Sequence, residues 1–137
     1  MTYLVDTNVL SELCRPHPHE GVMEWFRQND SELGVSVLTM GELVKGIQLL
    51  NRSKRRSQIE NWYKRIETWT EGRLFPVSGS VMNRWGAFYA YHQKRGRKLN
   101  LMDSLIAATA LEYQLVIATR NESDFPDGVD VINPWKS

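Results

Sequence analysis

Two hydrophobic patterns alternate along this chain. Short segments of strand character occur five times, and between them lie longer segments whose apolar residues are spaced three and four positions apart, as on one face of a helix. Strands that alternate with helices in this way predict a parallel sheet covered by helices on both faces. The predicted strands are Tyr3–Val5, Val35–Val37, Leu74–Val77, Leu115–Ala118 and Val129–Ile132.

The ends of the predicted helices follow from proline, glycine and polar turn residues. Pro16 and Pro18 cannot continue the first helix, and Gly72 and Gly96 end two later ones. Residues 51–56 form a polar, basic stretch that we expect to be a turn. We expect helices between Asp6 and Arg15, at Glu20–Asn29, at Thr39–Leu50, through Ile59 to Trp69, up to about Arg95 and at Leu101–Tyr113, with a short turn or helix at Asn121–Phe125.

Composition places the chain among ordinary globular proteins. Its 137 residues correspond to about one domain, and we expect a single domain over residues 1–137. The sequence is 42% hydrophobic and 24% charged, and Cys14 is the only cysteine, which excludes an internal disulfide. No basic leader precedes an apolar core, and no apolar run approaches the ~20 residues of a membrane helix. We expect a cytoplasmic protein without membrane contact.

The basic residues are unevenly distributed, although the formal net charge is only +1. Seven Lys or Arg and one acid, Glu60, fall between Lys45 and Arg65, and four more lie from Lys94 to Lys98 without an acid. Each cluster alone is typical of a solvated helix face. Binding of a polyanion becomes the better interpretation only if both clusters face the same edge of the sheet as the acids described next.

Four acids stand at equivalent places in the alternation of strands and helices. Asp6 follows the first strand directly, Glu42 opens the helix after the second, Asp103 lies in the first turn of an alanine-rich helix, and Asp124 opens the segment after the fourth strand. Each acid alone suits a helix cap, worth ~0.3–1 kcal/mol beside the helix dipole. Thr39 and Glu42 have the spacing of a capping box, and the pairs Asn100/Asp103 and Asn121/Asp124 are close variants.

Together the four acids indicate a metal site. Connections from strand to helix in a parallel sheet all emerge at one edge, so these side chains can converge in one cleft. Clustered carboxylates repel one another unless a cation intervenes, and Mg²⁺ or Mn²⁺ favours oxygen ligands. The absence of His and Cys among the four argues against zinc. An ion held there, beside helix N-termini that suit phosphate, could polarise a phosphodiester and acidify a water molecule. Nucleic acid is therefore the expected substrate.

Four sequence motifs resemble those of PIN-domain proteins, and in particular the VapC/FitB-type toxins of bacterial toxin–antitoxin operons. The resemblance covers essentially the whole chain, to Val131-Ile132-Asn133-Pro134-Trp135 near its end. No single motif would be specific, but four in this order and at this spacing are a strong signal. The motifs are Leu4-Val5-Asp6-Thr7-Asn8-Val9-Leu10-Ser11, Val37-Leu38-Thr39-Met40-Gly41-Glu42-Leu43-Val44-Lys45-Gly46, Met102-Asp103-Ser104-Leu105-Ile106-Ala107-Ala108-Thr109-Ala110 and Ala118-Thr119-Arg120-Asn121-Glu122-Ser123-Asp124-Phe125.

This resemblance implies a three-layer α/β/α PIN domain with a five-stranded parallel sheet. It also implies an endoribonuclease that depends on Mg²⁺ or Mn²⁺ and acts as the toxin of a type II toxin–antitoxin system. The expected partners are an RNA substrate, a cognate antitoxin protein that silences the toxin, and operator DNA reached only through the antitoxin. A homodimer or a larger toxin–antitoxin hetero-oligomer is the implied assembly.

The resemblance also assigns roles to individual residues. Asp6 and Asp103 would be the principal metal ligands, Glu42 the third acid, and Asp124 would complete the site through a water molecule. Thr119 and Asn121 would orient Asp124. Thr7 and Asn8 would either hydrogen-bond to the ligands or simply cap the first helix, and Arg95, Arg97 and Lys98 are the expected RNA contacts. The cluster from Arg52 to Arg56 is the weaker RNA candidate, because this region of the family lies near antitoxin and dimer contacts.

Three alternatives stay open. A non-catalytic PIN-like partner that supports antitoxin binding to operator DNA would keep repression after its acids are neutralised. A phospho-receiver would need a phosphoacceptor Asp after a central strand and a Lys near a later one, whereas the third strand here ends in Val77-Ser78-Gly79 and the fourth in Thr119-Arg120. A structure-specific DNase of related fold is not excluded by the motifs.

Overall fold

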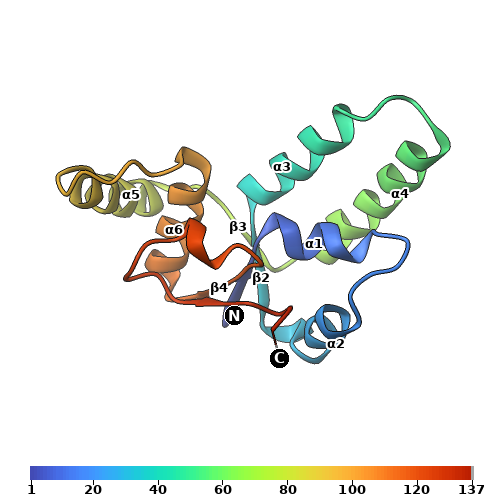
Figure 1. Cartoon of the computed structure of the whole chain (residues 1–137), viewed down its shortest axis with the longest axis horizontal. Coiled ribbons are helices and arrows are strands. Elements are labelled where there is room, and N and C mark those ends of the chain that lie inside the picture. Colours follow the sequence, from blue (N-terminus) through green and yellow to red (C-terminus); the bar gives the residue numbers. More distant parts are fainter. Residues whose placement is uncertain (137) are drawn as a thin grey trace.

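The computed structural model describes residues 1–136, so that Ser137, the last residue of the predicted domain, lies outside the described residues. Five parallel strands form one sheet in the order β3-β2-β1-β4-β5, which confirms the predicted parallel five-stranded sheet (Figure 1). The earliest strand, β1, therefore lies at the centre. The strands are β1 (Tyr3–Val5), β2 (Leu33–Ser36), β3 (Leu74–Phe75), β4 (Val116–Ala118) and β5 (Val131–Ile132).

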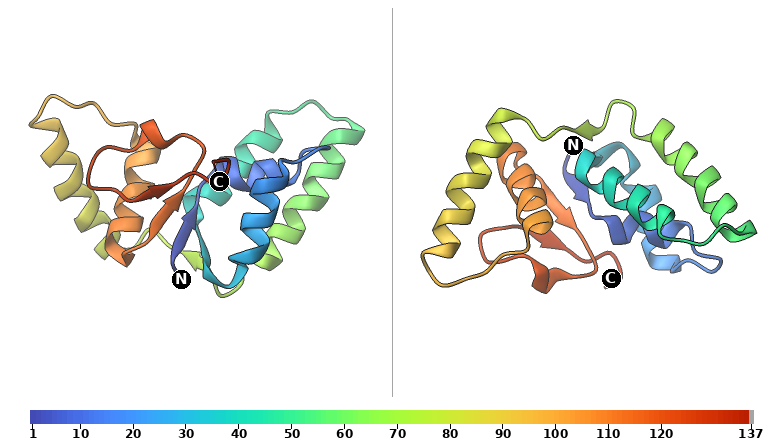
Figure 2. Two further views of the ribbon diagram at one scale, coloured as in Figure 1. Left: turned by 60° about the horizontal axis from the view of Figure 1, so that its bottom comes forward. Right: turned by 90° about the horizontal axis from the view of Figure 1, so that it is seen from above.

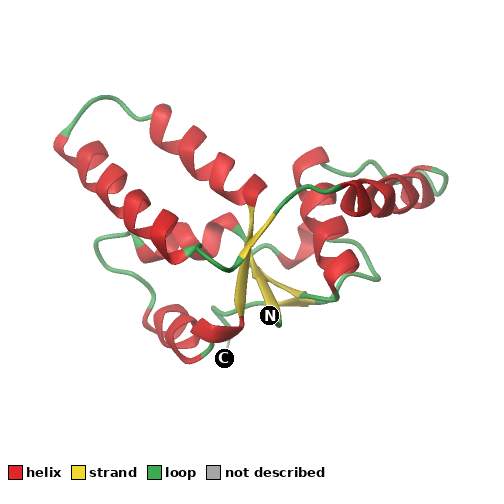
Figure 3. Ribbon diagram, turned by 180° about the vertical axis from the view of Figure 1, so that it is seen from behind, coloured by secondary structure: helices red, strands yellow, loops and turns green. Residues whose placement is uncertain are grey.

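Helices cover both faces of this sheet. Four helices, α1 to α4, lie on one side, and α5 and α6 lie on the other (Figures 2 and 3). No helix within residues 1–136 is both long and apolar enough to cross a membrane. The helices are α1 (Thr7–Leu13), α2 (Glu20–Gln28), α3 (Val37–Gln48), α4 (Lys54–Trp69), α5 (Gly79–Gln93) and α6 (Leu101–Tyr113), with short 3₁₀ helices η1 (Asp30–Glu32) and η2 (Glu122–Asp124).

Two hydrophobic cores result from the alternation of side chains along β1. Val5 points into the core beneath α1 to α4, whereas its neighbour Leu4 points into the core beneath α6. Both side chains are fully buried. The small residues of α6 let that helix lie close to the sheet, as predicted, since Ala107, Ala108 and Ala110 are almost completely buried. The central strand is thus held on both faces, and its carboxyl end is fixed in space.

The start of α3 differs from the prediction. Strand β2 ends at Ser36, and Val37 begins the helix instead of ending the strand. The Ser36 hydroxyl is the N-cap and accepts a 3.0 Å hydrogen bond from the backbone N–H of Leu38. The predicted capping box of Thr39 and Glu42 is therefore wrong. Thr39 is completely buried inside α3, and its hydroxyl has no hydrogen-bond partner in the described part of the chain.

One other helix and one strand also differ from the prediction in their boundaries. Helix α4 begins at Lys54, with the Ser53 hydroxyl accepting a hydrogen bond from the N–H of Arg56, so the predicted turn over residues 51–56 is shorter than expected. Strand β3 has only two residues because the chain leaves the sheet before Pro76. Close approach of β3 to β2 requires the glycine at Gly34, where an added Cβ would lie 2.4 Å from the Phe75 ring.

Candidate active site

All four predicted acids line one cleft at the carboxyl edge of the sheet. The cleft has a volume of about 360 Å³ and is lined by residues of α1, α3, α6 and the η2 turn. Each acid comes from a different connection after a strand, so only the fold brings them together. The lining residues are Asp6, Thr7, Asn8, Ser11, Glu42, Asp103, Asn121 and Asp124.

Asp6 is both a helix cap and the most deeply placed acid of the cleft. Its Oδ1 accepts a 2.9 Å hydrogen bond from the N–H of Thr7, which makes it the N-cap of α1. Its Oδ2 accepts a 2.9 Å hydrogen bond from the Thr119 hydroxyl and a longer one, 3.4 Å, from the Asn8 amide. Asp6 is only 7% exposed, and this burial raises its pKa, against the lowering effect of the Thr119 and Thr7 hydrogen bonds.

Asn8 connects the two sides of the cleft. Its amide nitrogen donates to the Thr119 hydroxyl at 3.1 Å, and its amide oxygen accepts from the backbone N–H of Arg120, also at 3.1 Å. The N–H of Asn121 donates to the same Thr119 hydroxyl. The loop after β4 is thereby attached to α1. Of the two roles left open for Asn8, hydrogen bonding around Asp6 is the one observed, since Asp6 itself provides the cap.

Glu42 enters the cleft from the second turn of α3, not the first. The Thr7 hydroxyl donates a 2.7 Å hydrogen bond to its Oε1, which ties α3 to the first residue of α1. Thr7 is therefore also a hydrogen-bonding residue of the cleft. Because the helix begins two residues earlier than predicted, Glu42 reaches the cleft through its side chain and makes no cap at the helix N-terminus.

Asp103 has the most perturbed carboxyl group of the cleft. It lies in the first turn of α6, where its N–H donates to the side-chain oxygen of Asn100, the N-cap, at 3.0 Å. Burial, followed by the negative charges of Asp124, Asp6 and Glu42, raises the pKa of Asp103 to about 6. The other three acids are thus close enough to Asp103 to disfavour its ionisation.

Asp124 is exposed and ends the η2 turn. Its N–H donates to the Asn121 carbonyl at 3.0 Å, while the Asn121 side chain makes no capping hydrogen bond. The capping-box variant predicted for this pair is therefore wrong, in contrast to the pair Asn100/Asp103, in which the asparagine does cap. Asn121 and Asp124 both line the cleft, but no hydrogen bond joins Thr119 or the Asn121 side chain to the Asp124 carboxylate within residues 1–136.

The chemistry of these donors suits a hard divalent cation. Every donor is an oxygen, and the pKa of Asp103 is raised first by burial and then by the negative charge of the other three acids, which a cation would offset. No three His, Cys, Asp or Glu side chains of residues 1–136 are gathered tightly enough to form a preformed ligand set. An ion held by one or two carboxylates and several water molecules, as is usual for Mg²⁺, would fit this looser arrangement.

The predicted RNA contacts Arg95, Arg97 and Lys98 lie in the exposed loop between α5 and α6, shortly before Asp103. Arg97 approaches Nδ1 of the buried His92 at 2.8 Å, and the guanidinium carbon of Arg95 lies 3.4 Å from the centroid of the Tyr91 ring. Burial, together with the charges of Arg97 and Arg95, lowers the pKa of His92. His92 is thus neutral at pH 7 and can accept a hydrogen bond from Arg97.

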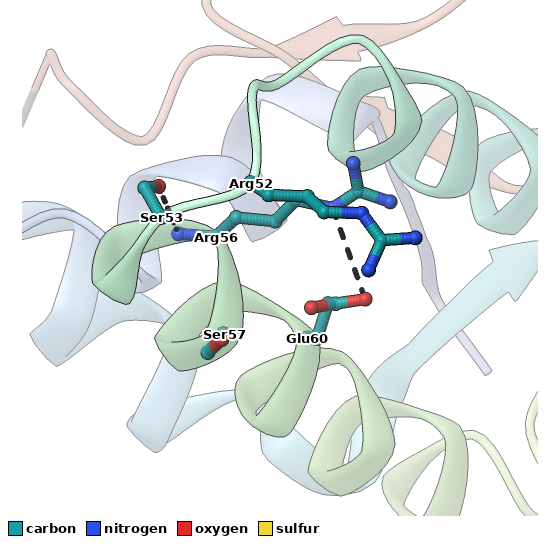
Figure 4. A pocket seen from close by; sticks show the side chains of 5 residues that line it. All are labelled: Arg52, Ser53, Arg56, Ser57 and Glu60. Atoms are coloured by element: carbon teal, nitrogen blue, oxygen red, sulfur yellow. Dashed lines mark hydrogen bonds and ion pairs between the residues drawn. The ribbon is translucent and has the colours of Figure 1, made fainter.

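The other basic cluster surrounds a separate pocket at the tip of the α3–α4 hairpin. Arg52, Ser53, Arg56, Ser57 and Glu60 line a cavity of about 210 Å³ (Figure 4). The Arg56 guanidinium donates to the Leu50 carbonyl at 2.9 Å and to the Gln48 side chain at 3.2 Å. Arg56 therefore holds the hairpin closed, and this cluster is remote from the acids of the cleft.

Sequence reasoning missed Ser11 and Glu12. Ser11 lines the cleft one turn after Thr7, on the same face of α1, and this spacing of four residues was the available signal. Glu12 is only 4% exposed and accepts a 2.9 Å hydrogen bond from the N–H of His19, which fixes the loop after α1. Nothing in the sequence distinguishes Glu12 from a solvated helix residue.

The profile of the PIN domain family matches residues 3–127. The chain belongs to the PIN-domain family. Its relatives include Toxin FitB of Neisseria gonorrhoeae, which is 35% identical over 135 residues, covering 96% of this chain and 97% of that protein. They also include VapC ribonuclease Y4jK of Sinorhizobium fredii, which is 32% identical over 136 residues, covering 97% of each chain. The predicted resemblance is confirmed.

Solved structures of PIN-domain toxins have the same fold. The crystal structure of FitAcB from Neisseria gonorrhoeae matches with a TM-score of 0.89 and 32% identity, covering 99% of this chain and 100% of that one. The structure of FitAB bound to an IR36 DNA fragment matches with a TM-score of 0.87 and 32% identity, covering 99% and 97%. The predicted three-layer PIN fold is thus confirmed over nearly the whole chain.

Proposed function

We propose that this PIN-domain protein is the toxin of a type II toxin–antitoxin system and that it cuts RNA with the help of a divalent cation. The observation that carries the proposal is the convergence of four carboxylates, from four separate connections, in one cleft. Burial, and then the negative charges of the other three acids, raise the pKa of Asp103. Relatedness to a VapC ribonuclease supports a nuclease in general, and the cleft supports the choice of a metal-dependent one.

Asp6, Asp103, Glu42 and Asp124 would hold Mg²⁺ or Mn²⁺, one or two of them directly and the others through water molecules. Such an ion, when bound, supplies Lewis acidity at the scissile phosphate and lowers the pKa of a water molecule. The protein side chains supply positioning. Thr119 and Thr7 donate hydrogen bonds to Asp6 and Glu42, so that these two carboxylates keep one orientation while Asp103 and Asp124 complete the negative site.

The RNA backbone would be bound by basic residues of the loop before α6. Arg95, Arg97 and Lys98 are exposed, and the loop leads directly to the helix that carries Asp103. Phosphate contacts of this kind position a strand without reading its sequence. The donors of the α6 N-terminus favour a negatively charged substrate at the same place.

The partners proposed for this chain follow from its relatives. FitAcB and FitAB are complexes, and FitAB has been solved with DNA. By analogy, we infer a cognate antitoxin protein that inhibits the nuclease, contact with operator DNA only through that antitoxin, and a homodimer or toxin–antitoxin hetero-oligomer as the assembly. We infer a cytoplasmic location for the same reason.

The experiment that tests this proposal is cleavage of a mixed cellular RNA pool by purified protein freed of antitoxin. Parallel reactions contain Mg²⁺, Mn²⁺ or EDTA, and each is repeated with Asp103→Asn and with Asp130→Asn as the matched control. Asp130 is an exposed acid outside the cleft. We expect fragments with either ion, none with EDTA or Asp103→Asn, and normal cleavage by Asp130→Asn. A folded protein that cuts no RNA under any condition would instead favour a non-catalytic partner of the antitoxin.

A further inference from the structure

A second basic site lies beside Asn8 and Asn121, two residues that line the cleft. Its central residue is Arg120, which directly follows Thr119, the donor to Asp6. The backbone of Arg120 is fixed at both ends. Its N–H donates to the Asn8 side chain at 3.1 Å, and its carbonyl accepts from the Asn133 side chain at 3.3 Å. The side chain therefore starts from a rigid point at the rim of the cleft.

The segment after β5 folds back to support this site. The Asn133 amide also donates to Glu122 at 3.0 Å, and its oxygen accepts from the N–H of Trp135 at 2.9 Å. Lys136 forms a 2.9 Å ion pair with the same glutamate. Trp135 packs against the core beneath α1, and the guanidinium carbon of Arg120 lies 5.4 Å from the centroid of its ring. This is a cation–π contact, which limits the freedom of the arginine.

The positive charge of Arg120 is not neutralised by the acids around it. Glu122 is engaged by Lys136 and Asn133, and Glu12 is engaged by Arg15 at 3.2 Å and by the N–H of His19. Arg120 is exposed, and no Asp or Glu within residues 1–136 forms an ion pair with it. Burial raises the pKa of Glu12, but the His19 hydrogen bond and the charges of Arg15 and Arg120 outweigh this effect, so that the pKa is lowered overall. Because both arginines act on Glu12, both lie near α1.

We propose that Arg120, in cation–π contact with Trp135, binds a backbone phosphate of single-stranded RNA beside the scissile bond, on the α1 side of the cleft. This inference rests on the proposed ribonuclease function. The strand would then cross the acids between two cationic points, with Arg95, Arg97 and Lys98 on the α6 side. A guanidinium presents a planar fork of donors that matches phosphate, and one already held against a ring loses less freedom on binding.

A cation at Arg120 would offset the repulsion between the acids of the cleft and the RNA backbone. Four carboxylates repel a phosphodiester strand, and an ion in the cleft compensates only at the scissile phosphate. A fixed cation one loop away would hold the neighbouring phosphate against this repulsion. Such a contact binds the ground state and the transition state equally, so its loss raises KM and leaves kcat almost unchanged.

The test compares Arg120→Ala and Arg120→Lys with Arg65→Ala. Arg65 is an exposed arginine of α4, remote from the cleft. Its variant therefore removes the same charge at a position for which no RNA contact is proposed. Two measurements are made: KM and kcat for RNA cleavage, and equilibrium binding of a fluorescent, random-sequence, single-stranded oligoribonucleotide in EDTA over a range of salt concentrations. Trp135→Phe keeps an aromatic ring beside Arg120 and an apolar side chain against the core, so it is the variant that should retain the cation–π contact.

We expect Arg120→Ala to raise KM about five- to tenfold at constant kcat and to lower the slope of log K against log salt by roughly 0.7. Arg120→Lys should keep the slope but weaken binding about two- to threefold, because the fork and much of the cation–π contact are lost. Trp135→Phe should have a KM, an affinity and a salt slope close to those of wild type. Arg65→Ala should also match wild type in these three quantities.

Unchanged KM, affinity and salt slope in Arg120→Ala would overturn the inference. The two proposals fail separately in this design. A wild-type protein that cuts no RNA refutes the ribonuclease, whereas the dependence of RNA binding on Arg120 is read in EDTA and does not require cleavage.

Discussion

The hydroxyl of Thr119 donates a 2.9 Å hydrogen bond to Oδ2 of Asp6, although the two residues are 113 positions apart in the sequence. Both follow strands directly, and β1 and β4 are neighbours in the sheet. Thr119 is completely buried, and its hydroxyl also accepts hydrogen bonds from Asn8 and from the N–H of Asn121. The Thr119 hydroxyl therefore makes the shorter of the two hydrogen bonds that hold Oδ2 of Asp6, while the Thr7 N–H holds Oδ1.

Replacing Thr119 with Val should disturb both stability and activity. The variant keeps the shape of the side chain but leaves the Asp6 oxygen and two donors without their partner, at a cost of about 1–3 kcal/mol in the free energy of unfolding. We expect kcat for RNA cleavage to fall with it. Urea unfolding and RNA cleavage measure the two effects. Thr119→Ser is the control because it restores the hydroxyl. Full activity in the Val variant would show that Asp6 needs no such support.

Replacing Asp103 with Asn should abolish RNA cleavage and stabilise the ion-free protein. The pKa of Asp103 is about 6 in the folded state and 3.8 as a model value, so its ionisation costs folding free energy at pH 7. This cost disappears as the pH falls through 6 towards 4. We expect Asn to add on the order of 1 kcal/mol at pH 7 after allowance for solvent screening, and little at pH 4. Urea unfolding in EDTA measures it, and an equal effect at both pH values would contradict it.

Divalent cations should stabilise the wild-type protein through the cleft. An ion that binds only the folded state raises its stability by about 2.7 kcal/mol when present at a hundred times its Kd. We expect Mn²⁺ or Mg²⁺ to raise the Tm of wild type and of Asp130→Asn. The shift should be much smaller in Asp6→Asn, which removes a proposed ligand. A shift of equal size in Asp6→Asn would place the ion elsewhere.

Stability should also depend on His92. Its pKa is lowered in the folded state by burial and by nearby arginines, so the unfolded chain binds a proton more readily below about pH 6.5, the usual value. His92 therefore makes the protein less stable as the pH falls, the opposite direction from Asp103. The difference in urea stability between wild type and His92→Gln isolates this contribution. It should decrease steadily from pH 7 to pH 5, and a constant difference would mean that His92 is not held neutral.

The sequence predicted the sheet and the position of Asp6 because both depend on local patterns. An apolar strand followed at once by a helical pattern leaves little freedom for the residue between them. The same reasoning failed at α3. Val37 is β-branched and suits a strand, but Ser36, the residue before it, caps the helix, so Val37 becomes the first helical residue. The local sequence does not decide whether Val37 ends the strand or begins the helix.

The roles of the two basic clusters could not be predicted, because they depend on contacts between distant residues. Arg56 is used to hold the α3–α4 hairpin, through the Leu50 carbonyl and Gln48. Arg97 is directed by the buried His92, and Arg120 by Trp135. Nothing in the sequence distinguishes these three arginines, and only their partners in the fold separate a structural arginine from one available to a ligand.

The central claim is that RNA cleavage requires both a divalent cation and the carboxylates of the cleft. The most direct measurement is the initial rate of RNA cleavage as a function of Mg²⁺ concentration, for wild type, Asp6→Asn and Asp130→Asn, all free of antitoxin. We expect the rate to rise from zero and to saturate with Mg²⁺ for wild type and Asp130→Asn, and we expect no detectable rate for Asp6→Asn. Cleavage that continues in EDTA, or that survives in folded Asp6→Asn, would contradict it.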